Sequence, residues 1–167
     1  YKNGDLYTGK VKDGLRHGKG ELFQVSSSRN YKGQWAKDTL QGDMEITDPN
    51  WTFHGSMEVS TGTGFGTFNY KDGSKYSGEI VAFKREGDGT LKFKSGEIIS
   101  GLWTSNVNVK SASIIDEQGF QWMGDLYNMQ PTGHMKTKRP DGLVYDSIWE
   151  NGAMLQSLSV SVSRRVN

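Results

Sequence analysis

The sequence repeats itself about every 23 residues, and this period limits the fold more than any other feature. An aromatic or apolar residue, here called the lead, opens each unit. The leads are Tyr7, Tyr31, Phe53, Tyr76, Ile99, Trp122 and Tyr145. They follow one another at intervals of 24, 22, 23, 23, 23 and 23 residues. A fixed period of about 20 to 50 residues is typical of chains built from one repeated supersecondary unit.

Positions counted from the lead keep their character from unit to unit. Position +2 holds Gly9, Gly33, Gly55, Gly78, Gly101 and Gly124, and only the seventh unit differs, with Ser147. Position +4 holds Val11, Trp35, Met57, Ile80, Trp103, Leu126 and Trp149. Position +11 holds Gly18, Gly42, Gly64, Gly87 and Gly133. Because side chains alternate along a strand, the lead, +2 and +4 predict one face of a strand.

Glycine inside a strand usually marks the close approach of another group. We therefore expect the +2 glycines to lie under a ring from a neighbouring strand. The residues at +1 and +3, such as Thr8, Lys10, Ser77 and Glu79, are mostly polar. This alternation is typical of an antiparallel sheet with one solvated face.

The pattern resembles the MORN (membrane occupation and recognition nexus) repeat, in which Tyr-x-Gly-x-Trp is followed after about six residues by Gly-x-Gly and an aromatic run ending in Asp-Gly. The best matches are Tyr7-Thr8-Gly9 with His17-Gly18-Lys19-Gly20, and Gly64-Phe65-Gly66 through Asp72-Gly73 to Tyr76-Ser77-Gly78. The resemblance covers almost the whole chain. The three units from Ile99 onward depart from it, because they lack the complete Gly-x-Gly.

Together these features predict an all-β fold: one elongated, twisted antiparallel sheet of about seven stacked β-hairpins. One hairpin is marginal alone, so stacking supplies the stability. Units start near residues 7, 31, 53, 76, 99, 122 and 145, residues 1–6 are the tail of a preceding unit, and residues 156–167 form a closing strand. About six residues, such as 12–17 or 81–86, are expected to connect the two strands of a hairpin.

The opposite face changes toward the C-terminus. Leu102, Met123 and Ile148 replace the polar residues of earlier units. We expect both faces to be covered in this part of the chain. Capping of the array, dimerisation and a bound partner each explain such a change, and capping is the simplest of them because end repeats are expected to be atypical.

Composition excludes several classes of protein. The 20 basic and 19 acidic residues give a formal net charge of +1, which does not indicate a nucleic-acid surface. With no cysteine, the chain has neither disulfides nor thiolate metal sites. No apolar run reaches the roughly 18 residues of a membrane span, and no signal peptide is apparent, so we expect a cytoplasmic protein.

No constellation of catalytic residues is apparent. His17, His54 and His134 occupy different positions of the repeat, at +10, +1 and +12, so they are not expected to meet. We find neither metal-ligand spacing nor a Ser–His–Asp arrangement. The sequence therefore predicts a protein that is not an enzyme and binds no metal or cofactor.

Aromatic residues dominate the predicted lead side of the sheet. They are Tyr7, Tyr31, Trp35, Phe53, Phe68, Tyr70, Tyr76, Phe93, Trp103 and Trp122. One interpretation is that the rings simply cover the sheet. The other is that they line a groove for a helical or extended segment of a protein partner, since aromatic residues are favoured interface anchors.

The family resemblance implies a scaffold or adaptor in a cytoskeletal, ciliary or membrane-associated assembly. It also leaves open a homodimer and a regulatory module within a larger enzyme. Weak contact with an anionic membrane or phosphoinositides is a further alternative, resting on Lys136, Lys138, Arg139, Arg164 and Arg165. This is a thin basis, because polybasic attraction normally needs about four to eight clustered cations.

Overall fold

The computed structural model describes residues 3–162, which contain fourteen β-strands and no helix. The first seven strands are β1 (Leu6–Lys12), β2 (Leu15–Gln24), β3 (Arg29–Ala36), β4 (Thr39–Thr47), β5 (Trp51–Glu58), β6 (Thr63–Tyr70) and β7 (Lys75–Val81). The other seven are β8 (Lys84–Lys92), β9 (Ile98–Thr104), β10 (Asn108–Ile115), β11 (Gln121–Tyr127), β12 (Gln130–Lys138), β13 (Leu143–Glu150) and β14 (Ala153–Val162).

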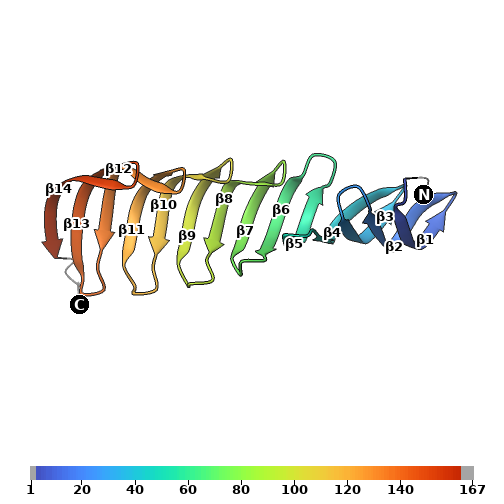
Figure 1. Ribbon diagram of the computed structural model, residues 1–167, viewed down its shortest axis with the longest axis horizontal. Helices are drawn as coiled ribbons and strands as arrows, with labels where there is room; N and C mark the ends of the chain where they lie inside the picture. Colours follow the sequence, from blue (N-terminus) through green and yellow to red (C-terminus); the bar gives the residue numbers. More distant parts are fainter. Residues whose placement is uncertain (1–2, 163–167) are drawn as a thin grey trace. The chain divides into compact units, whose positions relative to one another are not determined.

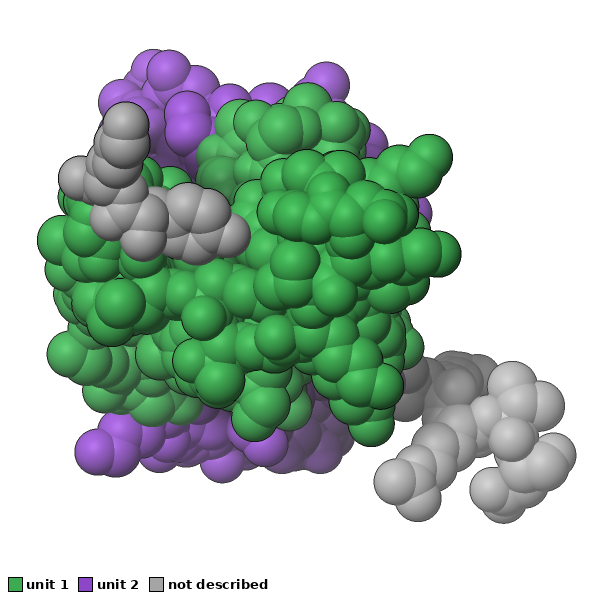
Figure 2. Space-filling view, turned by 90° about the vertical axis from the view of Figure 1, so that its right-hand side faces the viewer, with its two compact units in different colours: residues 1–83 green, residues 84–167 purple. Residues whose placement is uncertain are grey.

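The strands follow one another in a single open antiparallel sheet whose order is the order of the sequence (Figure 1). This confirms the predicted fold class of consecutive β-hairpins. The chain divides into two compact units, residues 1–83 and residues 84–167, which Figure 2 colours green and purple. Each unit is described by itself below.

Pairing between successive hairpins keeps one register, except that the pairing of β10 with β11 shifts between Val109 and Ala112. The lead lies opposite +15 of the preceding hairpin, +2 lies opposite +13, and +4 lies opposite +11. In residues 1–83 the pairs are Tyr31 with Leu22, Gly33 with Gly20 and Trp35 with Gly18. In residues 84–167 they are Ile99 with Leu91, Gly101 with Gly89 and Trp103 with Gly87. These positions therefore share one face of the sheet, called here the lead face.

The connections within hairpins are shorter than predicted. β1 ends at Lys12 and β2 already begins at Leu15, so two residues, not about six, make the turn. The β1–β2 register shifts between Gly9 and Val11, which marks a bulge. Gly18 takes a left-handed φ of 65° on the bulged strand. Some of the residues that the sequence pattern assigns to the connection therefore lie in the bulge. The left-handed φ in the bulge explains the glycine at +11.

The hairpin of β5 and β6 is built differently. Its register runs without a shift from Trp51 opposite Tyr70 to Glu58 opposite Thr63. Residues 59–62 form its connecting loop. Gly64, at +11, has no left-handed φ, whereas Gly62 in the loop does, at 64°. This hairpin therefore carries its additional residues in the loop and not in a bulge.

The +2 glycines lie under side chains, as expected, but the covering group differs from the prediction. A Cβ atom added to Gly9 would lie 2.6 Å from the Tyr7 hydroxyl oxygen, and one added to Gly20 would lie 2.6 Å from Tyr7 Cζ. The ring thus covers Gly20 on the neighbouring strand and also the glycine of its own strand. The Tyr7 hydroxyl donates to the Lys10 carbonyl oxygen at 3.0 Å, which holds the ring along β1.

The core lies on the lead face. Its fully buried side chains include Ile46, Phe53, Tyr76, Ile80, Trp103, Val109 and Met135. The opposite face is mostly exposed. Leu102 is 48% exposed and Met123 is 43% exposed, whereas Ile148 is half-buried. Cover of Leu102 and Met123 by a second copy of the chain or by a partner stays a prediction.

Candidate partner-binding surface

The ten predicted groove residues fall into two groups by exposure. Six are buried: Tyr31, Trp35, Phe53, Phe68, Tyr76 and Trp103. Four are half-buried: Tyr7, Tyr70, Phe93 and Trp122. The buried rings cover the sheet and have little surface left for another molecule. Direct contact with a partner through this set is therefore limited mainly to the four half-buried rings.

Two buried tryptophans at +4, Trp35 and Trp103, join their hairpins to the preceding ones. The Trp35 indole N–H donates to the Gly20 carbonyl oxygen at 3.0 Å. The Trp103 indole N–H donates to the Gly89 carbonyl oxygen at 2.9 Å. Gly20 and Gly89 occupy the same +13 position in their units, so one contact recurs in both halves of the chain. The rings thereby fill the lead face and also satisfy a backbone acceptor.

An arginine at +9 covers the outer face of each of these tryptophans. The Arg16 guanidinium carbon lies 4.4 Å from the centroid of Trp35, and that of Arg85 lies 4.9 Å from the centroid of Trp103. These distances are within the range of cation–π attraction. Both tryptophans are therefore enclosed between the sheet and an arginine from the preceding hairpin.

The residue at +7 completes this contact. Asp38 Oδ1 accepts from the Arg16 backbone N–H at 2.7 Å and from Arg16 Nε at 3.0 Å. Asn106 Oδ1 accepts from the Arg85 backbone N–H at the same 2.7 Å. The hydrogen bond from the Arg16 backbone N–H, helped by the guanidinium, holds the pKa of the Asp38 carboxyl below its ordinary value. Asp38 is therefore ionised at neutral pH.

Two aromatic side chains and an arginine bring distant strands of residues 1–83 together. The Arg29 guanidinium, at the start of β3, lies 5.3 Å from the ring centroid of Trp51 and 5.1 Å from that of Phe83. Arg29 Nε also pairs with Asp48 at 2.9 Å. Phe83 follows β7, four strands beyond β3 in the sheet order. The lead face of residues 1–83 is consequently concave.

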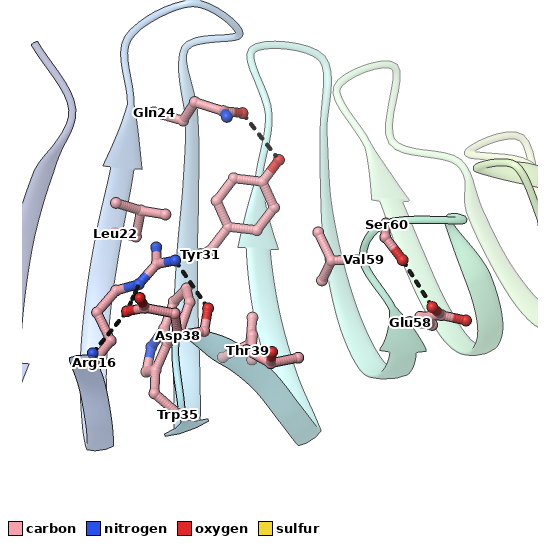
Figure 3. A pocket seen from close by; sticks show the side chains of 11 residues that line it. Arg16, Leu22, Gln24, Tyr31, Trp35, Asp38, Thr39, Glu58, Val59 and Ser60 are labelled. Atoms are coloured by element: carbon pink, nitrogen blue, oxygen red, sulfur yellow. Dashed lines mark hydrogen bonds and ion pairs between the residues drawn. The ribbon is translucent and has the colours of Figure 1, made fainter. Parts of the chain in front are cut away.

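A cavity of about 500 Å³ opens on this concave face (Figure 3). Its walls come from β2, from the β3–β4 hairpin and from the loop after β5. The lining residues are Arg16, Leu22, Gln24, Tyr31, Trp35, Asp38, Thr39, Leu40, Glu58, Val59 and Ser60. In Figure 3, Val59 stands across the opening from Tyr31 and Leu22. Two of the predicted groove residues, Tyr31 and Trp35, are thus brought together at one cavity.

The sequence analysis missed several residues of this site. Arg16 and Asp38 were not singled out, although the same pair of positions recurs as Arg85 and Asn106. The loop residues Glu58, Val59 and Ser60 were missed as well. Only the recurrence at +9 and +7 was a signal in the sequence. Nothing local indicated that the loop would form a wall.

The histidines do not form a metal site. His54 Nδ1 lies 3.6 Å from Glu45, and His134 Nε2 lies 3.8 Å from Asp146, each in a separate pair. Within residues 3–162, no group of three or more potential ligands could hold a metal ion. The same stretch contains no helix with the length and apolarity needed to cross a bilayer.

Comparison with known proteins assigns no family. No model of a protein family matches the sequence, and no curated protein is similar to it. The repeat and the geometry of the lead face are therefore the features that bear on function.

Proposed function

We propose that this protein is a non-catalytic scaffold of the MORN-repeat type that binds a helical or extended segment of a protein partner on the lead face of its sheet. The observation that supports this most strongly is the combination, on one face, of half-buried aromatic rings and a mostly apolar cavity. From the resemblance we further propose that this scaffold acts in a cytoplasmic assembly of cytoskeletal, ciliary or membrane-associated type.

The energetics of the lead face favour binding. Half-buried rings such as Phe93 and Trp122 still expose apolar surface, and covering it removes that surface from water at a gain of about 25 cal/mol per Å². Trp122 lies on β11, and Phe93 directly follows β8, where its backbone N–H donates to the Glu97 carbonyl oxygen at 2.8 Å. The backbone that carries these rings is therefore already ordered before a partner arrives. Preorganisation of this kind lowers the entropic cost of association.

Membrane binding is less well supported by the charges. Lys136 Nζ lies 4.0 Å from Asp146, and the Arg139 guanidinium lies 3.0 Å from Asp141. Two of the three cations that the structure describes in this region are therefore accompanied by a carboxylate. Arg164 and Arg165 lie outside the described residues.

The experiment that tests the proposal is an affinity pull-down from native extract, analysed by mass spectrometry. Alanine at Tyr76 or Trp103 would be uninformative, because both side chains are fully buried and their loss creates cavities that cost about 3 to 5 kcal/mol. The better variant is Phe93→Ser combined with Trp122→Ser. The matched control is Phe65→Ser combined with Leu102→Ser, which removes exposed apolar side chains from the opposite face.

We expect wild type and the opposite-face control to retain the same partner, and the Phe93→Ser/Trp122→Ser protein to lose it. Circular dichroism and denaturation curves check that all three proteins are folded. If the lead-face variant retains the partners of wild type, or if only the opposite-face control loses them, the proposal fails.

A further inference from the structure

We propose that the cavity in residues 1–83 receives one bulky apolar side chain of the partner segment, and that a lysine or arginine beside that side chain pairs with Glu58. This inference rests on the proposed function and specifies which partner chemistry the lead face selects. Three features of the cavity support it.

The first feature is the shape and polarity of the walls. Leu22, Tyr31, Trp35, Leu40 and Val59 supply apolar surface around a volume of about 500 Å³. Pockets for small molecules have volumes of about 300 to 1,000 Å³, so this cavity has room for one bulky side chain. A cavity of this size and lining suits an aromatic or large aliphatic side chain, the kind of anchor that contributes most to protein interfaces.

The second feature is the charge of the lining. Arg16 contributes +1, and Asp38 and Glu58 contribute −1 each, which leaves a net −1. The Arg16 guanidinium is already engaged, because it bonds Asp38 through Nε and through NH2 and stacks on Trp35. It is therefore a poor receptor for an incoming carboxylate or phosphate.

Glu58, by contrast, has only neutral neighbours. Its oxygens accept from the Ser60 hydroxyl at 2.7 Å and from the Thr61 hydroxyl at 3.3 Å. Among residues 3–162 it forms no ion pair with a basic side chain. Figure 3 shows the Glu58 side chain behind Val59, beside the cavity. A cation next to the inserted side chain would therefore gain a carboxylate partner without competing with an existing one.

The third feature is the position of the cavity in the array. Elsewhere, the backbone N–H at the turn of one hairpin donates to the turn of the preceding hairpin, as from Asp38 to Arg16 at 3.2 Å and from Phe83 to Gly62 at 3.0 Å. Among the described residues, no such bond links the β5–β6 loop to the β3–β4 turn. The cavity lies at this interruption, where the wall formed by Glu58, Val59 and Ser60 is not tied to the facing turn.

A display library of random short peptides, selected on the full chain, tests the inference. We expect wild type to select peptides that carry a bulky apolar residue with a lysine or arginine within a few positions. Val59→Trp places a large side chain in the opening and should therefore weaken the affinity for these peptides at least about tenfold. Val25→Trp is the control, because Val25 is an exposed valine outside the cavity lining.

Charge reversal tests the second half of the inference. Glu58→Lys should abolish the preference for basic neighbours, and selection on this variant should yield acidic ones. Glu79→Lys makes the same change in charge on the opposite face and should leave the wild-type preference intact. The inference is overturned if wild type selects no peptides, if Val59→Trp binds the selected peptides as wild type does, or if Glu58→Lys retains the basic preference.

These failures are distinct from failure of the proposed function. Suppose that the Phe93→Ser/Trp122→Ser protein loses a partner that wild type, Val59→Trp and Glu58→Lys retain equally. The scaffold proposal would then stand, but the cavity would have no part in binding that partner. Binding to vesicles of phosphatidylserine and phosphatidylcholine, with no selected peptides, would also overturn the inference.

Discussion

At the scale of single residues, two kinds of aromatic side chain share the lead face. Rings such as Trp35 and Trp103 are buried and hydrogen-bonded to the preceding hairpin, so they hold the array together. Rings such as Phe93 and Trp122 are half-buried and remain accessible. The sequence pattern does not distinguish the two kinds, and only their burial separates the structural rings from the rings for which we propose a binding role.

The hydrogen bond of the Trp103 indole should make a measurable contribution to the free energy of unfolding. Trp103→Phe keeps an aromatic ring but removes the part-buried hydrogen bond to the Gly89 carbonyl oxygen, and a hydrogen bond of this kind contributes about 0.5 to 1.5 kcal/mol. Urea unfolding of purified protein measures the loss. Trp122→Phe is the control, since its half-buried ring makes no such contact among the described residues. Equal losses in the two variants would contradict the assigned role.

The stability of the folded protein should depend on pH through the ionisation of Asp38. Its pKa is lowered in the folded protein from an ordinary value of 3.8, so its contribution is present above that value and is lost as the pH falls through the lowered pKa. At pH 7, Asp38→Asn should keep the hydrogen bond from the Arg16 backbone N–H, as Asn106 does with Arg85, and should lose only the contribution of the charge. The variant should also lose less stability than wild type between pH 5 and pH 2.

Unfolding midpoints in urea across this pH range provide the comparison. Asn106→Asp is the reciprocal variant, and it should gain the acid dependence that Asp38→Asn loses. An identical pH profile for Asp38→Asn and wild type would show that the ion pair with Arg16 does not contribute to the acid response.

At the scale of the hairpin, much of the fold could be predicted from the sequence. The 23-residue period and the alternation at the lead, +2 and +4 are sufficient to predict strands, their faces and an antiparallel sheet. The bulges were not predicted, because a residue count does not distinguish a bulge from a longer loop. The units led by Phe53 and Tyr76 both have a length of 23 residues and glycine at +11. The first nevertheless connects its strands by a four-residue loop, residues 59–62, whereas the second uses a two-residue turn, residues 82–83.

Long-range contacts explain why this loop and the candidate site were harder to predict. The Phe83 backbone N–H donates to the Gly62 carbonyl oxygen. The Phe83 ring also packs near Trp51, with 6.3 Å between the ring centroids. Such contacts join residues that are far apart in sequence. Likewise, the aromatic face follows from local alternation, but the cavity requires β2, the β3–β4 turn and the β5–β6 loop to meet.

Amide hydrogen exchange should reveal that the β5–β6 loop lacks the hydrogen bond that links other turns to the preceding hairpin. The backbone N–H groups of Asp38, Asn106 and Met129 donate to the preceding turn at 3.2, 3.1 and 2.7 Å. We expect these amides to exchange slowly, because opening them requires separation of neighbouring hairpins. The Ser60 amide, at the same +7 position, should exchange much faster. Nuclear magnetic resonance resolves each amide, and equal protection of Ser60 would contradict the proposed break.

At the scale of the whole molecule, stability is distributed and not central. The strand contacts that dominate the fold join consecutive strands, so each hairpin depends chiefly on its neighbours. Such a chain needs no single core, and its repeated face offers many similar positions to a partner. The cavity in residues 1–83 is a local departure from this regularity, which is why we assign the specificity to it.

The central claim is that a partner covers the lead face, and side-chain footprinting tests it most directly. The protein captured from native extract and the purified protein would be labelled by hydroxyl radicals and compared by mass spectrometry. We predict that labelling of Tyr7, Phe93 and Trp122 falls in the captured protein, while Phe65 and Met123 on the opposite face label equally in both. Protection of Phe65 and Met123, with Tyr7, Phe93 and Trp122 unchanged, would contradict the account.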